Sequence, residues 1–440
     1  MSFGDCELFI LRMAIDAAEN KQKQSFIITP EIKDIIEIVE DFIRSDKFIC
    51  YGGTAINNIL PEEDQFYTNK EVPDYDFYST NALENAKKLA DIYYARGYSD
   101  ILAKPSVHIG TFKVFVNGIG IADITDLNPE LFNNLYDDCI RVNGIMYANP
   151  QFLRQSMYLE LSSPEGDIER WEKVLKRLLL LNKHYPIEHI VNCSSNFQRG
   201  FTKNHKKESE IFKITRDVFI EHGCVFIGAY ADSLYSRFMP HEKRKLLKKV
   251  PDFDVLATNP LKCIDILVST LKYNGIPAKF KKHNAIGELI SDHYEVIVDS
   301  ETIAFIYEPV ACHSYNVLKM DDKTVKVGTI DTLLSYYFAF LYSNRSYYDM
   351  DRIMCMCHYL YEVQQRNRLK QNGLLKRFSI DCYGKQTTLE SLRVYKKEAF
   401  ERLKNNPNSK EYERLFLKYT PGEVTPSCQK RKTRKRKIKS

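Results

Sequence analysis

The order of apolar and polar positions predicts a strand, a helix and further strands in the first part of the chain. The apolar run at 48–51 is short and typical of a strand, and 113–124 reads as two strands or one bent strand. Between them, Asn81 can cap a helix over 82–96 and Gly97 is placed to end it. This alternation predicts an α/β unit.

The same order recurs later in the chain. The segment Pro73-Asp74-Tyr75-Asp76 reappears 178 positions later as Pro251-Asp252-Phe253-Asp254. Upstream of each lies a small-residue turn that follows an apolar run, Gly52-Gly53-Thr54-Ala55 in the first case and Gly228-Ala229-Tyr230-Ala231 in the second. Such self-similarity indicates two tandem copies of one folding unit.

Composition indicates a soluble globular protein. The chain has 440 residues, which is enough for two or three domains with proper cores. Charged residues interrupt its first 20 positions, so they do not read as a secretory signal, and no stretch of about 18 apolar residues predicts a membrane span. Eleven scattered cysteines favour free thiols in a reducing compartment. Cys355-Met356-Cys357-His358 lacks the spacing of a zinc finger, and we expect no metal there.

The net charge of +5 is concentrated at one end of the chain. Residues 430–440 contain eight of the 63 lysines and arginines, which leaves 55 basic against 58 acidic residues elsewhere. Such a basic tail suits sequence-independent contact with RNA, and a localisation signal or a merely solvated tail are the alternatives.

Three aspartates carry the candidate chemistry. Asp74 and Asp76 point to the same face if they lie on a strand, because side chains alternate along it. Asp123 ends an apolar run, where an isolated carboxylate would be costly unless it were paired or bound to a metal. A glycine turn at Gly52-Gly53 precedes them and offers backbone N–H groups to a phosphate. Carboxylates that hold Mg²⁺ beside such a turn are typical of nucleotide transfer.

The second copy lacks part of this set. Beyond the helix the offset between the copies becomes 182, which aligns Ala122 with Ala304 and Asp123 with Phe305. Arg154 aligns with Leu334, which makes Arg154 a candidate triphosphate contact, against the alternative of a surface arginine. We therefore expect a catalytic domain at 1–191 with its core at 48–190, and an inactive copy at 211–345. The remaining parts are a linker at 192–210, a helical accessory region at 346–429 and the basic tail at 430–440.

With these motifs in place, the chain resembles the polymerase-β-like nucleotidyltransferases. More narrowly, it is similar to the poly(A) polymerase catalytic subunits of large DNA viruses, in the giant-virus branch. The likeness rests on the segments 51–56, 73–79, 90–93, 107–109 and 150–154, and it extends more weakly to about residue 345. It implies an α/β, or α+β, fold of tandem nucleotidyltransferase-like units with mixed sheets flanked by helices, the first active and the second degenerate.

The resemblance also implies particular roles. Asp74, Asp76 and Asp123 would hold two Mg²⁺ or Mn²⁺ ions, one on all three and one on Asp74 and Asp76. Gly52 and Gly53 would form the phosphate-binding turn, ATP would be the donor and an RNA 3′ end the acceptor. Many relatives have serine where this chain has Gly53, and Thr54 is a candidate for the missing hydroxyl. The expected location is the virion and the host cytoplasm.

Alternatives remain at this stage. The chain could add uridylate or CCA, could nucleotidylate a protein or a small molecule, or could be a non-catalytic RNA-binding scaffold. Base selectivity depends on a pocket that the sequence does not place. The internal second copy favours a self-sufficient homodimer over an enzyme that needs a separate processivity partner.

Overall fold

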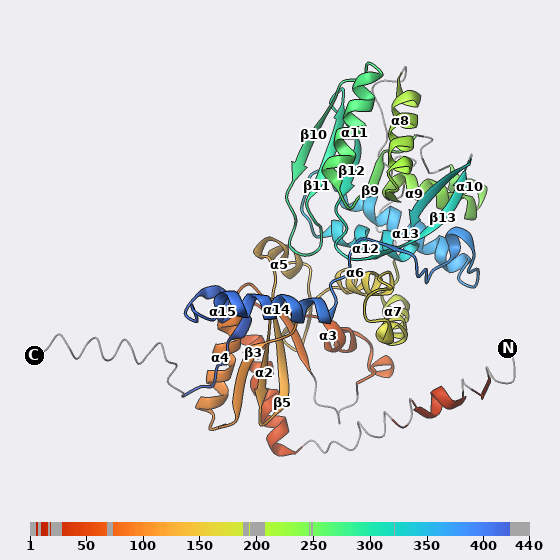
Figure 1. Ribbon diagram of the computed structural model, residues 1–440. Coiled ribbons are helices and arrows are strands. Elements are labelled where there is room, and N and C mark those ends of the chain that lie inside the picture. The colour runs from red at the N-terminus through yellow and green to blue at the C-terminus, as the bar shows by residue number, and fades with distance from the viewer. Residues whose placement is uncertain are drawn as a thin grey trace, which may run out of the picture. The chain divides into compact units, whose positions relative to one another are not determined.

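The structure is a computed structural model that describes residues 29–67, 74–187, 207–245, 250–320 and 322–422, together with 6–7, 10–15, 18, 193 and 247. The chain divides into two compact units (Figure 1). The first unit comprises Met1–Leu127, Cys139–Ala148 and Leu389–Ser440, and the second comprises Asn128–Asp138 and Asn149–Thr388. The basic tail and most of the predicted linker lie outside the described residues.

A seven-stranded mixed sheet forms the centre of the first unit, in the order β3-β4-β5-β2-β1-β7-β6. The strands are β1 (Ile49–Cys50), β2 (Tyr75–Ser79), β3 (Ile101–Pro105), β4 (Thr111–Val116), β5 (Ile119–Asp126), β6 (Ile140–Val142) and β7 (Ile145–Tyr147). β2 and β5 are parallel, whereas β4 runs antiparallel to β5. The run at 113–124 is therefore two strands, joined by a tight turn at Asn117-Gly118 where both residues have positive φ.

Helices α2 (Pro30–Ser45) and α4 (Ala82–Ala95) pack together against this sheet (Figure 1). The hydroxyl of Tyr75 on β2 donates to Glu40 of α2 at 2.5 Å, and the ring of Phe77 packs 6.3 Å from that of Phe42. Because strand side chains alternate, Asp76 points to the opposite face. The predicted helix is confirmed, with Gly97 at φ +97° after its end. Asn81 occupies the N-cap position but gives no side-chain cap.

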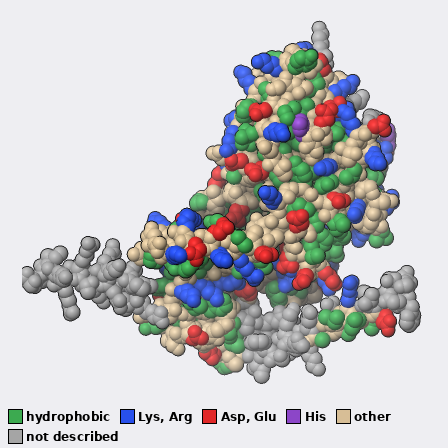
Figure 2. Space-filling view, in the orientation of Figure 1, with side chains coloured by type: hydrophobic (Ala, Val, Ile, Leu, Met, Phe, Trp, Pro, Cys, Tyr) green, Lys and Arg blue, Asp and Glu red, His purple; other side chains and the backbone are tan. Residues whose placement is uncertain are grey.

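The end of the chain returns to the first unit. Helices α14 (Leu389–Leu403) and α15 (Lys410–Phe416) belong to it, and Tyr419 exchanges two backbone hydrogen bonds of 2.9 Å with Ala103 of β3. Arg414 pairs with Asp126 at 2.7 Å, and Glu413 pairs with Lys87 at 2.5 Å. On the face shown in Figure 2, basic and acidic side chains lie interspersed over these helices. The predicted accessory region at 346–429 is thus divided between the two units.

The second unit contains an eight-stranded mixed sheet in the order β10-β11-β12-β9-β8-β14-β13-β15. Its strands are β8 (Val225–Ile227), β9 (Phe253–Leu256), β10 (Ala278–His283), β11 (His293–Val298), β12 (Glu301–Tyr307), β13 (His313–Met320), β14 (Lys323–Gly328) and β15 (Cys382–Tyr383). If the strands of each sheet are numbered in chain order, the first sheet runs 3-4-5-2-1-7-6 and the second runs 3-4-5-2-1-7-6-8. The spatial order of the first seven strands is therefore the same in both sheets. The predicted fold class, tandem units with mixed sheets flanked by helices, is confirmed.

The register of the two sheets is also the same. Asp76 lies opposite Asp123 in the first sheet, and Asp254 lies opposite Phe305 in the second. Both antiparallel hairpins carry an irregularity at the matching place, between Val114 and Phe115 and between Val296 and Ile297. The alignment offsets of 178 and 182 therefore describe a repeat in three dimensions.

Helices of both copies meet inside the second unit. These helices are α5 (Pro129–Tyr136), α6 (Pro150–Leu161), α7 (Trp171–His184), α8 (Glu208–Glu221), α9 (Gly228–Tyr235), α10 (His241–Arg244), α11 (Pro260–Tyr273), α12 (Ile330–Leu341) and α13 (Met350–Arg366). Tyr158 of α6 stacks on Phe338 of α12 with ring centroids 5.8 Å apart. Residues 149–187, expected in the catalytic domain, therefore group with the second unit.

Four cysteines differ from the expectation of free thiols. Cys193 is bonded to Cys355, and Cys312 is bonded to Cys382. The sequence could not show these pairs because their members are 162 and 70 positions apart. Six further cysteines form no disulfide within the described part of the chain: Cys6, Cys50, Cys139, Cys224, Cys263 and Cys357. No helix in the described parts of the chain is both long and apolar enough to cross a membrane.

Candidate active site

The three aspartates meet on the sheet face opposite α2 and α4. Asp123 lies directly across from Asp76 on the neighbouring parallel strand, and Asp74 immediately precedes β2 on the same side as Asp76. One carboxylate oxygen from each lies within 4.8 Å of the others. Asp76 and Asp123 are half-buried and Asp74 is exposed, so the cluster faces solvent. Such a set of hard oxygen donors fits a small divalent cation.

A lysine that the sequence reading missed sits in this cluster. Lys113 lies opposite Asp123 on β4, and its ammonium nitrogen is 2.5 Å from a carboxylate oxygen of Asp123. The pKa of Asp74 is raised above its ordinary value, first because its carboxylate is partly removed from water and second because Asp123 is near; Lys113 opposes the shift. Lys113 therefore offsets part of the repulsion among the carboxylates.

The glycine turn is built around Asp76. Gly52 is the first residue of α3 (Gly52–Ile59), has φ +71°, and a Cβ there would lie 2.5 Å from a carboxylate oxygen of Asp76. Only glycine fits this backbone conformation and this close approach. Tyr51 at the N-cap gives α3 no side-chain hydrogen bond. The N–H groups of the first turn, including that of Gly53, thus form the positive end of a helix beside the carboxylates.

Thr54 has a different task from the one expected. Its side chain is buried, and its hydroxyl donates to the backbone carbonyl of Asp74 at 2.8 Å. This bond holds the start of β2 against α3 and so positions Asp74. The expected contact between Thr54 and a triphosphate is not supported by this arrangement.

Arg154 is also placed differently from the expectation. It lies on α6 in the second unit, whereas the aspartates lie in the first. Its side chain is fully buried, and its guanidinium donates to side-chain oxygens of Asn182 and Gln151, both at 2.7 Å, and to the carbonyl of Tyr185. Burial lowers the pKa of Arg154 to about 10. These bonds tie α6 to α7, so packing accounts for the arginine without a nucleotide.

The second unit keeps the turn and loses the cluster. Gly228 has φ +72°, and a Cβ there would lie 2.1 Å from a carboxylate oxygen of Asp254, as at Gly52 and Asp76. Phe305 fills the position of Asp123, is fully buried, and its ring stacks on that of Tyr347 at 5.2 Å. Glu295 takes the position of Lys113. Among the described residues, no metal-binding cluster of acids forms at this second turn.

The first unit therefore combines the sheet, the glycine turn and the acid triad of a nucleotidyltransferase-like fold, and the second unit repeats the sheet without the triad. Comparison with known proteins narrows this class. Residues 37–167 match the family described as poly(A) polymerase catalytic subunit. That range contains the glycine turn and all three aspartates.

Two relatives and one solved structure agree with this match. The chain is 33% identical over 173 residues to a protein of Acanthamoeba polyphaga mimivirus and 31% identical over 164 residues to one of African swine fever virus, strain Badajoz 1971 Vero-adapted, both named "Putative poly(A) polymerase catalytic subunit". These alignments cover 38% and 36% of this chain but only 29% and 34% of the relatives. The crystal structure of the Megavirus polyadenylate synthase superposes with a TM-score of 0.78 at 21% identity, covering 100% of this chain and 91% of that one. At this identity the likeness shows the fold.

Proposed function

We propose that the chain is a template-independent RNA polymerase that adds AMP from ATP to RNA 3′ ends. The observation that carries the proposal is the convergence of Asp74, Asp76 and Asp123 beside the Gly52 turn, inside the region that matches poly(A) polymerase catalytic subunits. The equivalent turn in the second unit, where Phe305 replaces the third acid, makes that unit non-catalytic in this proposal.

The donor set fits divalent metal ions. One of the three carboxylates, that of Asp123, already pairs with a cation, the ammonium of Lys113, which supports a cation site at this place. We assign Asp74, Asp76 and Asp123 as ligands for Mg²⁺ or Mn²⁺, with two ions per site. When bound, these ions would supply Lewis-acid stabilisation of the triphosphate and lower the pKa of the RNA 3′ hydroxyl.

The chain's own residues supply the positioning. Tyr51 provides no side-chain cap for the N–H groups at the start of α3, so these donors suit oxygens of the triphosphate. Thr54 holds the Asp74 backbone, and glycine at position 52 leaves room for the Asp76 carboxylate. Positioning of this kind provides much of the rate enhancement in phosphoryl transfer.

Primer extension tests the activity and its base selectivity. Purified protein is incubated with Mg²⁺ or Mn²⁺, a short RNA primer and each nucleoside triphosphate separately. Ladders with ATP alone support the proposal. Incorporation of another base indicates a uridylyl- or CCA-adding enzyme, and the absence of incorporation with every nucleotide, while the protein still binds RNA, indicates a scaffold.

Assembly and location extend the proposal. We propose that the chain acts as a homodimer without a separate processivity partner, in the virion and the cytoplasm of the infected host. Light scattering of the purified chain, together with tail-length analysis at limiting enzyme, tests the first part. A monomer that makes only short tails would contradict it.

A further inference from the structure

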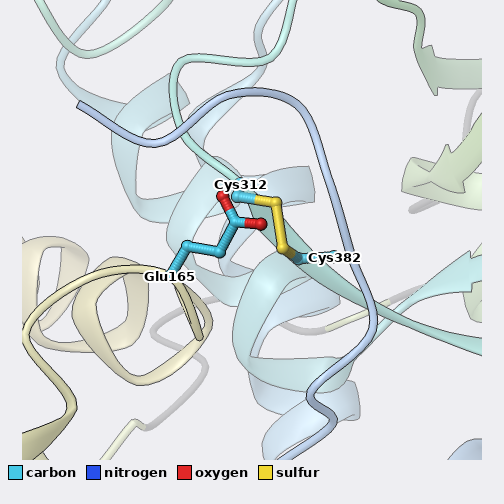
Figure 3. Close-up of side chains that lie close together, drawn as sticks. All are labelled: Glu165, Cys312 and Cys382. Atoms are coloured by element: carbon cyan, nitrogen blue, oxygen red, sulfur yellow. A yellow bond between two sulfur atoms is a disulfide. The ribbon is translucent and has the colours of Figure 1, made fainter. Parts of the chain in front are cut away.

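One mixed cluster of side chains lies in the second unit, whereas the acid triad belongs to the first. Figure 3 shows the carboxylate of Glu165 directed at the disulfide between Cys312 and Cys382. One oxygen of Glu165 and both sulfur atoms lie within 4.8 Å of one another. Glu165 comes from the turn after α6, Cys312 immediately precedes β13, and Cys382 begins β15. Two sulfurs and a carboxylate at this separation form a metal-ligand set once the sulfurs are not bonded to each other.

The three segments are held together by bonds that do not involve the disulfide. The backbone N–H of Ser314 donates to the carbonyl of Ser162 at 2.7 Å, which joins the turn after α6 to β13. β13 and β15 pair in antiparallel register, with Ser314 opposite Cys382. The N–H of Cys312 donates to the side-chain oxygen of Gln386 at 3.3 Å. Reduction of the disulfide therefore leaves all three ligand-bearing segments in place.

The surroundings of the three groups differ in a way that suits an open metal site. Cys312 is buried, Cys382 is half-buried and Glu165 is exposed, so the cluster reaches from the protein interior to solvent. None of the described lysines, arginines and histidines forms an ion pair with Glu165. The carboxylate is thus available, and a fourth coordination position can be taken by water.

We propose that the reduced form of this cluster binds one zinc ion through Cys312, Cys382 and Glu165. A dithiol reductant breaks the sulfur–sulfur bond by giving two electrons and two protons to the cysteines, and the reductant becomes a disulfide. Zn²⁺ then displaces the two thiol protons and forms two zinc–sulfur bonds and one zinc–oxygen bond. Thiolates select zinc over magnesium, so this site and the hard-oxygen triad take different metals.

Zinc replaces the cross-link that is lost when the disulfide is reduced. β15 contains only Cys382 and Tyr383, and after it the chain leaves the second unit at Leu389. In the oxidised protein the disulfide joins this short strand to the start of β13. In the reduced protein zinc makes the same connection, and β15 remains anchored in both redox states.

Cobalt(II) provides the test, because only thiolate ligands give it an intense sulfur-to-metal charge-transfer band. The full chain, reduced with a phosphine and titrated with Co²⁺, is expected to develop this band with one equivalent, and Zn²⁺ is expected to abolish it. The oxidised chain is expected to show no band. Cys312→Ser is expected to remove the band, and Glu165→Gln to weaken binding by about tenfold or more, since loss of even an outer-shell partner costs roughly 10–100-fold.

The other disulfide supplies a matched control. The double variant Cys193→Ser, Cys355→Ser loses two thiols from the same unit and is expected to keep the band. The proposal is overturned if the reduced wild-type chain gives no band, if the band survives Cys312→Ser, or if Glu165→Gln binds Co²⁺ as tightly as wild type. If Cys312→Ser does not fold, Glu165→Gln decides, because position 165 is exposed. The readout is a spectrum, so it is independent of whether the chain extends RNA.

Discussion

Phe305 lies opposite Asp254 on the neighbouring parallel strand of the second sheet, in the register that pairs Asp123 with Asp76 in the first. One fold thus carries two versions of the same site, and only one of them brings three carboxylates together. The second version works as an internal reference. A substitution at the first site can be matched by one at the equivalent position of the second.

Removing the charge of Asp123 is expected to abolish nucleotide addition without unfolding the protein. Asp123→Asn takes one ligand from the metal site, and loss of one such electrostatic group costs on the order of 10²–10³-fold in rate. Phe305 at the equivalent place shows that the strand folds without a carboxylate. Primer extension with ATP measures the rate, and Asp254→Asn is the matched control, which should stay active. Retention of most of the wild-type rate by Asp123→Asn would remove the basis for the proposed function.

Gly52→Ala is expected to damage both stability and activity. The new Cβ meets the Asp76 carboxylate at 2.5 Å, and the backbone at φ +71° costs an L-residue about 1–2 kcal/mol. Gly228→Ala imposes the same backbone conformation and a similar clash on Asp254. Thermal unfolding should show a lower melting temperature in both variants, whereas the rate of nucleotide addition per folded molecule should fall only in Gly52→Ala. Equal rates in the two would show that the Gly52 turn is structural alone.

Replacing Lys113 with methionine is expected to tighten binding of Mn²⁺ in the absence of nucleotide. The ammonium competes with the ion for Asp123, and a partly exposed ion pair is worth up to about 1 kcal/mol, or roughly fivefold in affinity. Titration calorimetry measures the change. Lys104→Met is the control, because Lys104 lies on the adjacent strand with its ammonium over the ring of Phe115. Weaker binding by Lys113→Met would mean that the lysine assists the metal.

Arg154→Met is expected to destabilise the protein while leaving the KM for ATP of the folded molecules unchanged. The guanidinium donates to Asn182, Gln151 and backbone carbonyls, and leaving such buried acceptors without a partner typically costs about 1–3 kcal/mol. Chemical denaturation and ATP kinetics together separate the effects. Arg170→Ala changes an exposed arginine and should alter neither the stability nor the KM for ATP. A raised KM at unchanged stability would restore Arg154 as a nucleotide contact.

The second unit is expected to lose stability in mild acid. Burial lowers the pKa of His293 to about 4 and that of His313 to about 3, so both are neutral in the folded protein. The unfolded chain binds protons below about pH 6.5, and stability therefore falls as pH drops from there toward about 4, by roughly 1.4 kcal/mol per pH unit for each histidine. Unfolding of His313→Gln across this range should show a shallower slope, and exposed His241→Gln should match wild type. An unchanged slope in His313→Gln would contradict the assignment.

Much of this architecture could be predicted because successive side chains alternate between the two sheet faces in the strands of both copies. This alternation fixes which face of the sheet each side chain takes. The sequence alignment of Asp76 with Asp254 and of Asp123 with Phe305 therefore predicted equivalent positions, and the sheets pair Asp76 with Asp123 and Asp254 with Phe305. The position of Lys113 could not be found in this way. An uninterrupted hairpin from the Asn117-Gly118 turn would pair Lys113 with Ala122, and only the irregularity after Val114 moves it opposite Asp123.

Long-range packing accounts for the other differences. Arg154 and Thr54 are polar residues near a motif, and nothing local distinguishes a ligand contact from a buried hydrogen bond. The partners of Arg154 lie about one helix further along the chain, at Asn182 and Tyr185. The return of α14 and α15 to the first unit depends on contacts such as Arg414 with Asp126, between residues far apart in sequence. Hydrophobic periodicity in a short stretch of sequence does not indicate contacts between residues this far apart.

The pairing of Tyr419 with Ala103 has a consequence for how the protein is made. Because a ribosome delivers the chain from its N-terminus, β3 emerges long before the segment that covers its outer edge. An open strand on a nascent polypeptide is a template for wrong partners, and this edge stays open until Tyr419 has been synthesised. The first unit to be translated is thus the last to be completed.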